Sequence, residues 1–330
     1  MNFIDLFAGA GGLSEGFIRS GYTPIAHVEK DEAACNTLKT RIAYHYLKNQ
    51  NKLDHYIQYL KGSINRETLY SFIPKEKLGS VINLEISTKN NKRIQKIIDE
   101  KLDGKTVDLI IGGPPCQAYS IAGRSRSKSK MKGDPRNYLF KEYAKYLGKY
   151  NPNALVFENV VGLKSAQGGQ YLIQMKNLFR QMGYTVKLYT LHANDFGVLQ
   201  NRKRIIIVGV KQNNGLVLPE LEKVKIEHDF IVQNIFEDLP SLKAGEGKNK
   251  FLNYRVKTNN YLKKFSIRNG IEVLTQHITR PHSENDKKIY SIAVKKWEKE
   301  GLRLNYNDLP KNLQTHKNTK SFVDRYKVVA

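Results

Sequence analysis

Four short apolar runs, each ending at glycine, proline or a carboxylate, constrain the fold of this chain more than any other feature. They occupy residues 2–7, 24–28, 107–111 and 154–157. A glycine-rich turn and a helical pattern separate the first two, so the order is strand, helix, strand. Short apolar strands with helical crossovers are typical of a parallel sheet that is covered on both faces. The sequence therefore predicts an α/β fold with a doubly wound, mostly parallel sheet and ligands at the carboxyl ends of its strands.

The pattern changes along the chain in a way that predicts two domains. Residues 41–105 are rich in lysine with weak helical periodicity, and we expect helices with an insertion there. The run at 204–210 belongs to the last strand pair of the first domain. After it, segments rich in lysine, tyrosine and asparagine show no regular period. Since 330 residues suffice for about two domains, we predict one at 1–210 and a smaller, irregular one at 211–330.

The charge of the chain favours a polyanionic partner. Lysine and arginine total 55 against 31 acidic residues, which gives a formal net charge of +24. Nucleic acid is the favoured partner. An acidic membrane surface fits less well because no amphipathic helix with a basic face stands out, and a general enrichment in lysine is the alternative. No stretch approaches the length of a membrane span and the first residues lack a signal peptide, so we expect an intracellular protein.

The glycine turn after the first strand predicts a cofactor site. Glycines at 9, 11 and 12 let a ligand approach the backbone, and Glu29 ends the next strand about twenty residues later, where its carboxylate accepts ribose hydroxyls. Ser14 stands where a dinucleotide fingerprint has its third glycine. A nucleoside cofactor without a pyrophosphate fits better than NAD. The alternative is an ordinary helix start with a surface carboxylate.

Cys116 is the candidate nucleophile. It follows Gly112, Gly113 and two prolines that fix the backbone at a strand end. The other cysteine, Cys35, is distant, so we expect no disulfide framework and no metal site. Residues 123–136 predict a mobile basic loop, and nearby positive charge lowers the pKa of a thiol. The alternative for Cys116 is a buried structural cysteine.

Four motifs in order resemble those of DNA cytosine-5 methyltransferases. They are Asp-Leu-Phe-Ala-Gly-Ala-Gly-Gly at 5–12, Gly-Gly-Pro-Pro-Cys-Gln at 112–117, Glu-Asn-Val at 158–160 and Gln-Asn-Arg-Lys-Arg at 200–204. The resemblance covers residues 1 to about 210, and 234–240 is similar to the start of the family's target-recognition region. It implies the class I fold of S-adenosylmethionine-dependent methyltransferases. It also implies transfer of a methyl group to carbon-5 of a flipped-out cytosine in double-stranded DNA.

The resemblance assigns a role to each motif. Cys116 would add to carbon-6 of the base, Glu158 would stabilise ring nitrogen 3, Arg204 would hold the carbonyl oxygen and Arg202 would support the thiolate and a phosphate. Glu85 precedes Ile86 where the family commonly has aspartate, which weakens the expected adenine contact. The residues implied in S-adenosyl-L-methionine binding are Phe7, Gly9, Gly11, Gly12, Glu29, Ile86, Pro114 and Leu139. Those implied in DNA binding, within or beside the basic loop, are Gln117, Ser120, Arg124, Arg126 and Lys128.

The carboxyl end departs from the family pattern. Neither the Arg-Glu-x-x-Arg helix nor the Gly-Asn-x-Val-x-Pro segment that closes the family's cofactor pocket occurs in the 330 residues. We expect a fragment, or one subunit of a split enzyme whose second polypeptide carries these motifs. The implied function is the modification enzyme of a bacterial restriction-modification system, cytoplasmic and associated with the nucleoid. The alternatives are a non-catalytic DNA-binding relative and a transfer-RNA cytosine methyltransferase.

Overall fold

The computed structural model describes residues 1–115, 134–224, 230–249, 251–268 and 270–327. The chain forms two compact units. The first contains Met1–Tyr59 and Ile64–Asp229, and the second contains Leu60–Ser63 and Phe230–Ala330. The candidate nucleophile Cys116 lies outside the described residues, and so does the predicted mobile loop at 123–136 except for its last three residues.

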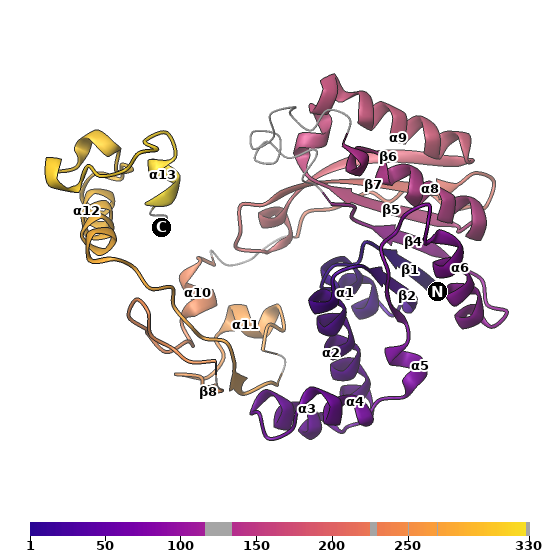
Figure 1. Ribbon diagram of the computed structural model, residues 1–330, viewed down its shortest axis with the longest axis horizontal. Helices are drawn as coiled ribbons and strands as arrows, with labels where there is room; N and C mark the ends of the chain where they lie inside the picture. Colours follow the sequence, from indigo (N-terminus) through magenta and orange to yellow (C-terminus); the bar gives the residue numbers. More distant parts are fainter. Residues whose placement is uncertain (116–133, 225–229, 250, 269, 328–330) are drawn as a thin grey trace. The chain divides into compact units, whose positions relative to one another are not determined.

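A seven-stranded sheet forms the centre of the first unit, in the order β3-β2-β1-β4-β5-β7-β6 (Figure 1). The five strands from β3 to β5 are parallel, and β7 runs antiparallel between β5 and β6. This confirms the predicted mostly parallel α/β sheet. The strands are β1 (Asn2–Leu6), β2 (Thr23–Glu29), β3 (Val81–Asn83), β4 (Leu109–Gly112), β5 (Ala154–Asn159), β6 (Tyr184–His192) and β7 (Lys203–Lys211).

Helices cover both faces of the sheet because successive strand residues point to opposite sides. Phe3 of β1 packs with Phe17 on one face, whereas Ile4 joins a larger core with Ile94 and Phe179 on the other. The helices are α1 (Gly12–Arg19), α2 (Glu32–Asn49), α3 (Leu53–Leu60), α4 (Arg66–Ser71), α5 (Lys75–Leu78), α6 (Asn91–Leu102), α8 (Leu139–Tyr150) and α9 (Gln170–Gln181). Short 3-10 turns are η2 (Pro135–Tyr138), η3 (Val161–Lys164), η4 (Ala166–Gly169) and η5 (Ala193–Phe196).

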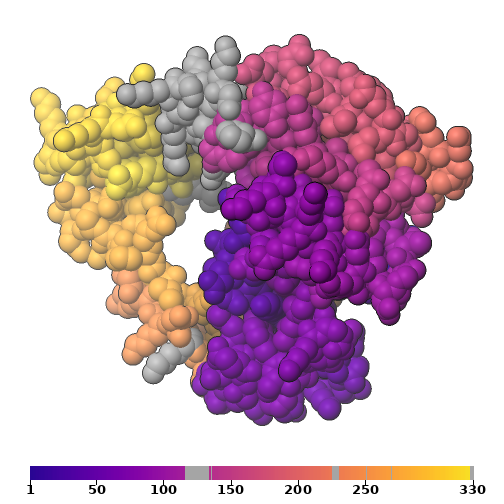
Figure 2. Space-filling model, turned by 45° about the vertical axis from the view of Figure 1, so that its right-hand side comes forward, coloured from indigo at the N-terminus to yellow at the C-terminus, as the bar shows by residue number. Residues whose placement is uncertain are grey.

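The lysine-rich stretch at 41–105 is largely helical, as predicted. Its first part forms α3, α4 and α5, which pack through a cluster around the buried Leu47, Leu69 and Ile73. In the space-filling view the residues of α3, α4 and α5, in purple, pack closely together (Figure 2). The stretch also contains β3, which the sequence pattern missed. Only three residues form this strand, too few to show a period.

The first unit continues beyond residue 210, where the sequence pattern placed a domain boundary. Residues after β7 are held against β6 and η5 by hydrogen bonds. The Tyr189 hydroxyl donates to the Pro219 carbonyl at 2.6 Å, and the Val224 amide donates to the Asp195 carbonyl at 2.9 Å. These contacts attach 211–224 to the sheet without adding a strand.

Apart from one 17-residue helix, the second unit is built from short elements. Ile289, Leu304 and Phe322 belong to its buried apolar cluster. Its elements are β8 (Leu252–Asn253), β9 (Val273–Leu274), α10 (Gln233–Phe236), α11 (Asn260–Lys264), α12 (Glu284–Glu300), α13 (Phe322–Arg325), η6 (Tyr306–Asp308) and η7 (Lys311–Leu313). Among the described residues of the whole chain, every helix is too short or too polar to cross a membrane.

Candidate active site and cofactor pocket

A pocket of about 240 Å³ lies at the carboxyl ends of the central strands. It forms there because β1, β2 and β4 end side by side in a parallel sheet, so the residues after each strand converge. Five of the predicted cofactor residues line it: Phe7, Gly9, Glu29, Ile86 and Leu139. Gly113, Pro115, Val28, Lys30, Leu84 and Glu85 complete the lining.

Three backbone amides fix the carboxylate of Glu29. The Gly9 amide donates to Oε2 at 2.8 Å, and the amides of Lys30 and Asp31 donate to Oε1 at 2.8 and 2.9 Å. A carboxylate has about four acceptor sites, so Oε2 keeps capacity for a further donor. This geometry suits a carboxylate that receives a sugar hydroxyl.

The turn after β1 has an uncommon backbone. Phe7 and Gly9 adopt left-handed conformations with φ of 58° and 54°. Such a conformation is costly for a residue with a Cβ and persists where the surroundings impose it, commonly at a functional site. Here it carries the chain past the pocket and turns the Gly9 amide toward Glu29.

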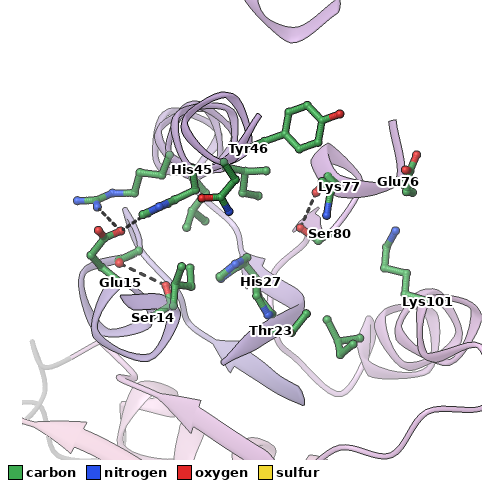
Figure 3. Close-up of a pocket in the computed structure, with 18 of the residues that line it drawn as sticks. Ser14, Glu15, Thr23, His27, His45, Tyr46, Glu76, Lys77, Ser80 and Lys101 are labelled. Carbon is green, nitrogen blue, oxygen red and sulfur yellow. Dashed lines mark hydrogen bonds and ion pairs between the residues drawn. The ribbon is translucent and has the colours of Figure 1, made fainter. Parts of the chain in front are cut away.

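The other predicted cofactor residues, Gly11, Gly12 and Pro114, are not among the residues that line this pocket. Gly11 lines a second cavity, whose lining also includes residues of α1, β2 and α2 (Figure 3), and Gly12 begins α1. Pro114 stands between the two lining residues Gly113 and Pro115. Glu85, which replaces the expected aspartate, lines the pocket and pairs with Lys30 at 3.0 Å in an exposed position.

The structure brings the two predicted base-binding residues together. Arg204 Nε lies 2.8 Å from Glu158 Oε1, because β5 and β7 run antiparallel at this point and Glu158 is paired with Ile206. Both side chains are partly exposed. A Cβ built on Gly113 would lie 2.9 Å from Glu158 Oε2, so the carboxylate reaches the backbone that leads to Cys116. Arg202 is exposed and precedes β7.

Asn159 is a site residue that the sequence argument did not single out. Its side chain is buried and donates to the Pro114 carbonyl at 3.3 Å, while its Oδ1 accepts from the Val160 amide at 2.9 Å. It therefore ties the end of β5 to the proline loop. The Glu-Asn-Val motif was the available signal. Because a Glu-Asn pair at a strand end is more often a helix cap, the motif did not indicate that Asn159 holds the proline loop.

The residues predicted to bind DNA lie outside the part of the chain that the structure describes. These residues, like Cys116, fall within 116–133 and are Gln117, Ser120, Arg124, Arg126 and Lys128. Their roles stay predictions.

Comparison with known proteins gives consistent results. The family model of C-5 cytosine-specific DNA methylases matches residues 1–65 and 76–328. The chain is 39% identical to the type II methyltransferase M.Bpa9945I of Bacillus paralicheniformis, over 99% of this chain and 81% of that protein. It is 31% identical to the type II methyltransferase M.DdeI of Desulfomicrobium norvegicum, over 86% of this chain and 59% of that protein.

A solved structure shares the fold. It is described as a DNA modification methyltransferase encoded within a prophage (E. coli), and it matches 88% of this chain and 74% of that chain. The TM-score is 0.61 at 20% sequence identity. The sheet order agrees with that fold, and the family match defines the class, that of S-adenosyl-L-methionine-dependent methyltransferases. Within this class, the chain belongs to the C-5 cytosine-specific DNA methylase family, whose methyl donor is S-adenosyl-L-methionine.

Proposed function

We propose that this DNA cytosine-5 methyltransferase is the modification enzyme of a restriction-modification system and methylates cytosine within one specific double-stranded sequence. The names of its type II relatives support the assignment to such a system. The observation that carries the proposal is the Glu158–Arg204 pair beside the Gly113 loop, next to a pocket suited to a nucleoside. The bacterial relatives and a DNA substrate together support a cytoplasmic enzyme associated with the nucleoid.

The pocket residues fit S-adenosyl-L-methionine. Glu29 would accept a ribose hydroxyl, and the glycine turn at 9, 11 and 12 would allow a close approach of the backbone. Phe7, Ile86 and Leu139 supply apolar surface, and Pro114 precedes the lining residue Pro115. When bound, this donor supplies an electrophilic methyl group on a sulfonium.

Cys116 would act as nucleophile on the base. Its thiolate forms a bond to carbon-6, and the electron pair moves to carbon-5, which thereby becomes able to accept a methyl group. After transfer, the proton on carbon-5 leaves to a base, the bond between carbon-6 and sulfur breaks, and the thiolate is restored. Arg202 would stabilise the thiolate and contact a phosphate.

Glu158 and Arg204 would recognise the cytosine from two sides. Glu158, when it carries a proton, would donate that proton to ring nitrogen 3 as negative charge builds there during addition, and its other oxygen would accept from the exocyclic amine, while Arg204 donates to the carbonyl oxygen. Their 2.8 Å ion pair sets the position of both groups before the base arrives. Neither reaches a stacked base, so the cytosine must be flipped out. Gln117, Ser120, Arg124, Arg126 and Lys128 would hold the opened DNA.

A second polypeptide is part of the proposal as a partner. In an open α/β sheet a later segment commonly supplies the outer wall of the ligand crevice and excludes water. A polypeptide with the Arg-Glu-x-x-Arg and Gly-Asn-x-Val-x-Pro motifs would supply that wall. Adding it to the 330-residue chain should lower the Kd for S-adenosylhomocysteine, measured by calorimetry. If the affinity for S-adenosylhomocysteine is unchanged at saturating polypeptide, the proposal of this partner is wrong.

Labelled methyl transfer tests the proposed function. The chain, with and without that polypeptide, is given labelled S-adenosyl-L-methionine and either double-stranded DNA or transfer RNA. We expect label in DNA only, lost in Cys116→Ala and kept in the matched control Cys35→Ala. Label in transfer RNA favours the RNA enzyme. Tight DNA binding without transfer under all conditions favours a non-catalytic relative.

A further inference from the structure

The loop at 84–90, which joins β3 to α6, supplies one wall of the cofactor pocket. Three of its residues line the pocket: Leu84, Glu85 and Ile86. β3 has only three residues and lies at the edge of the sheet, where β2 is its single neighbour. At the start of the loop, the Asn83 side chain donates to the Lys30 carbonyl at 2.9 Å. The position of the rest of the loop depends on contacts outside the sheet.

Glu142 of α8 receives hydrogen bonds from the far end of this loop. The Thr88 hydroxyl donates to its Oε1 at 3.2 Å, and Asn91 Nδ2 donates to its Oε2 at 2.5 Å. Asn91 is 5% exposed and the Glu142 side chain is 16% exposed. Lys145, on the same helix, donates to both carboxylate oxygens at 2.9 and 3.0 Å. Because the acceptor is a shielded carboxylate, these bonds are stronger than those between neutral groups.

A buried tyrosine fixes the orientation of the Asn91 amide. The Tyr146 hydroxyl donates to Asn91 Oδ1 at 2.9 Å. Burial and the nearby charge of Glu142 raise the pKa of Tyr146, so the hydroxyl keeps the proton that it donates. The amide nitrogen therefore faces Glu142, which has only acceptors to offer when ionised. Two successive turns of α8 thus hold the first residue of α6.

The helix that carries Glu142 is itself fixed to the centre of the sheet. Tyr143, the next residue, is buried, and its hydroxyl donates to the Ile110 carbonyl of β4 at 2.8 Å. The same helix begins at Leu139, which lines the cofactor pocket. α8 is therefore the stable reference against which the loop at 84–90 is placed.

Hydrogen bonds within the loop carry this constraint to Ile86. The Asn91 amide donates to the Ser87 carbonyl at 2.9 Å, and the Asn90 side chain donates to the Glu85 carbonyl at 3.0 Å. The two acceptors are the residues on either side of Ile86, which is buried and lines the pocket. A displacement of Asn91 would therefore move this wall of the pocket.

We propose that Glu142 is a positioning residue for the cofactor site, which holds Ile86 in place relative to Leu139 before S-adenosyl-L-methionine binds. Glu142 does not line the pocket, so it acts through the loop rather than by touching the cofactor. A site that is already in its binding conformation binds more tightly because less ordering is required. This inference rests on the assignment of the pocket to the cofactor proposed above.

Calorimetric titration of the full chain with S-adenosylhomocysteine tests the proposal. Glu142→Ala should raise the Kd about tenfold, and Glu142→Gln by less than about threefold, because the new amide oxygen still accepts from Asn91. Asp99→Ala is the matched control. Asp99 pairs with Lys149 at 2.7 Å and so links the same two helices, but it lies nearer the other end of α6. This control should leave the Kd within about twofold.

A double-mutant cycle separates positioning from a general loss of stability. Asn91→Ala should raise the Kd by about the same factor as Glu142→Ala, and the double variant should show no further increase, because both changes remove one contact. Affinity for DNA without cofactor should stay the same in all variants, and urea unfolding verifies that each is folded. If Glu142→Ala does not fold, the comparison of Asn91→Ala with Asp99→Ala decides, since Asn91→Ala removes that contact from its other side.

Three results would overturn the positioning role: an unchanged Kd in Glu142→Ala, an equal increase in Glu142→Ala and Asp99→Ala, or additive effects in the cycle. Glu29→Ala distinguishes this failure from failure of the pocket assignment. If Glu29→Ala weakens binding but Glu142→Ala does not, only the role of Glu142 is wrong. If neither variant changes the Kd, the pocket is not the cofactor site and both proposals are wrong.

Discussion

Glu29 illustrates how one side chain makes a ligand site out of strand ends. Its carboxylate bonds to amides from the turn after β1 and from the residues after β2, so two adjacent strand ends are joined through it. The same carboxylate lines the pocket and keeps acceptor capacity for a further donor. Cofactor recognition and local structure therefore depend on the same group.

Replacing Glu29 by alanine should weaken cofactor binding. Loss of a charged acceptor for a ribose hydroxyl typically removes 1.5–3 kcal/mol, or roughly 10- to 100-fold in affinity. The measurement is calorimetric titration with S-adenosylhomocysteine. Glu85→Ala is the matched control, since that carboxylate lines the same pocket but is exposed and pairs with Lys30. An equal loss in both variants would contradict the role of Glu29.

Asn159 offers a prediction about positioning rather than binding. Its amide holds the Pro114 carbonyl, so Asn159→Ala should leave the loop before Cys116 loose. A misplacement of about 1 Å can cost 100-fold in rate, so kcat should fall by at least tenfold while the Kd for S-adenosylhomocysteine stays within a few-fold. Single-turnover kinetics measure the chemical step. An unchanged kcat would show that the proline loop is held in other ways.

At the scale of elements, the carboxylate of Glu15 joins α1 to α2. It bonds to Arg19 on its own helix at 2.8 Å and to Arg41 and His45 on α2. Burial of the side chain opposes ionisation, but hydrogen bonds from His45 and Arg19 outweigh it, so the pKa of Glu15 is lowered. A carboxylate with a lowered pKa stabilises the fold above its unfolded pKa, and this stability is lost as pH falls through the folded value.

The variant Glu15→Gln should therefore lose about 1 kcal/mol of unfolding free energy at pH 7. The difference from the natural chain should begin to shrink as pH falls below the unfolded pKa of about 4.3, and it should vanish only below the lowered folded pKa, where the glutamate is protonated in both states. Urea unfolding at several pH values measures it. Glu100→Gln is a suitable control, because Glu100 is exposed and has no ion pair among the described residues. A difference that stays constant down to pH 3 would contradict the assignment.

The strands differ in how far the sequence predicts them. β1, β2, β4 and β5 are apolar runs that end at glycine or polar residues, and all four were predicted within a few residues. β3 is too short to show a period. β6 alternates apolar residues with threonine, lysine and histidine, as an antiparallel strand does when one of its faces meets solvent.

The candidate site, like the strands, was predicted from the sequence only in part. The glycine turn and the carboxylate at a strand end predicted Gly9 and Glu29 of the cofactor pocket, whereas Phe7, Ile86 and Leu139 were implied only by the family resemblance. The family resemblance implied that Glu158 and Arg204 act on the same base, but it did not predict their ion pair, which depends on the antiparallel register of β5 and β7. The hydrogen bonds that hold the loop after β3 to α8 were not foreseen, because they join residues that are far apart in the sequence.

On the scale of the whole molecule, the net charge of +24 is the property most relevant to the substrate. If lysines and arginines neutralise phosphates, the logarithm of the DNA affinity should fall linearly with the logarithm of salt concentration, by about 0.9 per phosphate contact. Fluorescence anisotropy between 50 and 200 mM salt, roughly the range in which such losses reach 10³- to 10⁵-fold, measures the slope. A slope near zero would mean that the charge serves another purpose.

The central claim is that Cys116 attacks the base covalently, and one measurement tests it most directly. The full chain, with the polypeptide that carries the closing motifs where it is required, is incubated with S-adenosyl-L-methionine and DNA that contains 5-fluorocytosine at the target position. Fluorine cannot leave as the proton does, so the bond between carbon-6 and sulfur persists after methyl transfer. We predict a complex that survives denaturing electrophoresis and is absent in Cys116→Ala but present in Cys35→Ala. Methylation of ordinary target DNA without any such complex on the fluorinated DNA would contradict the account.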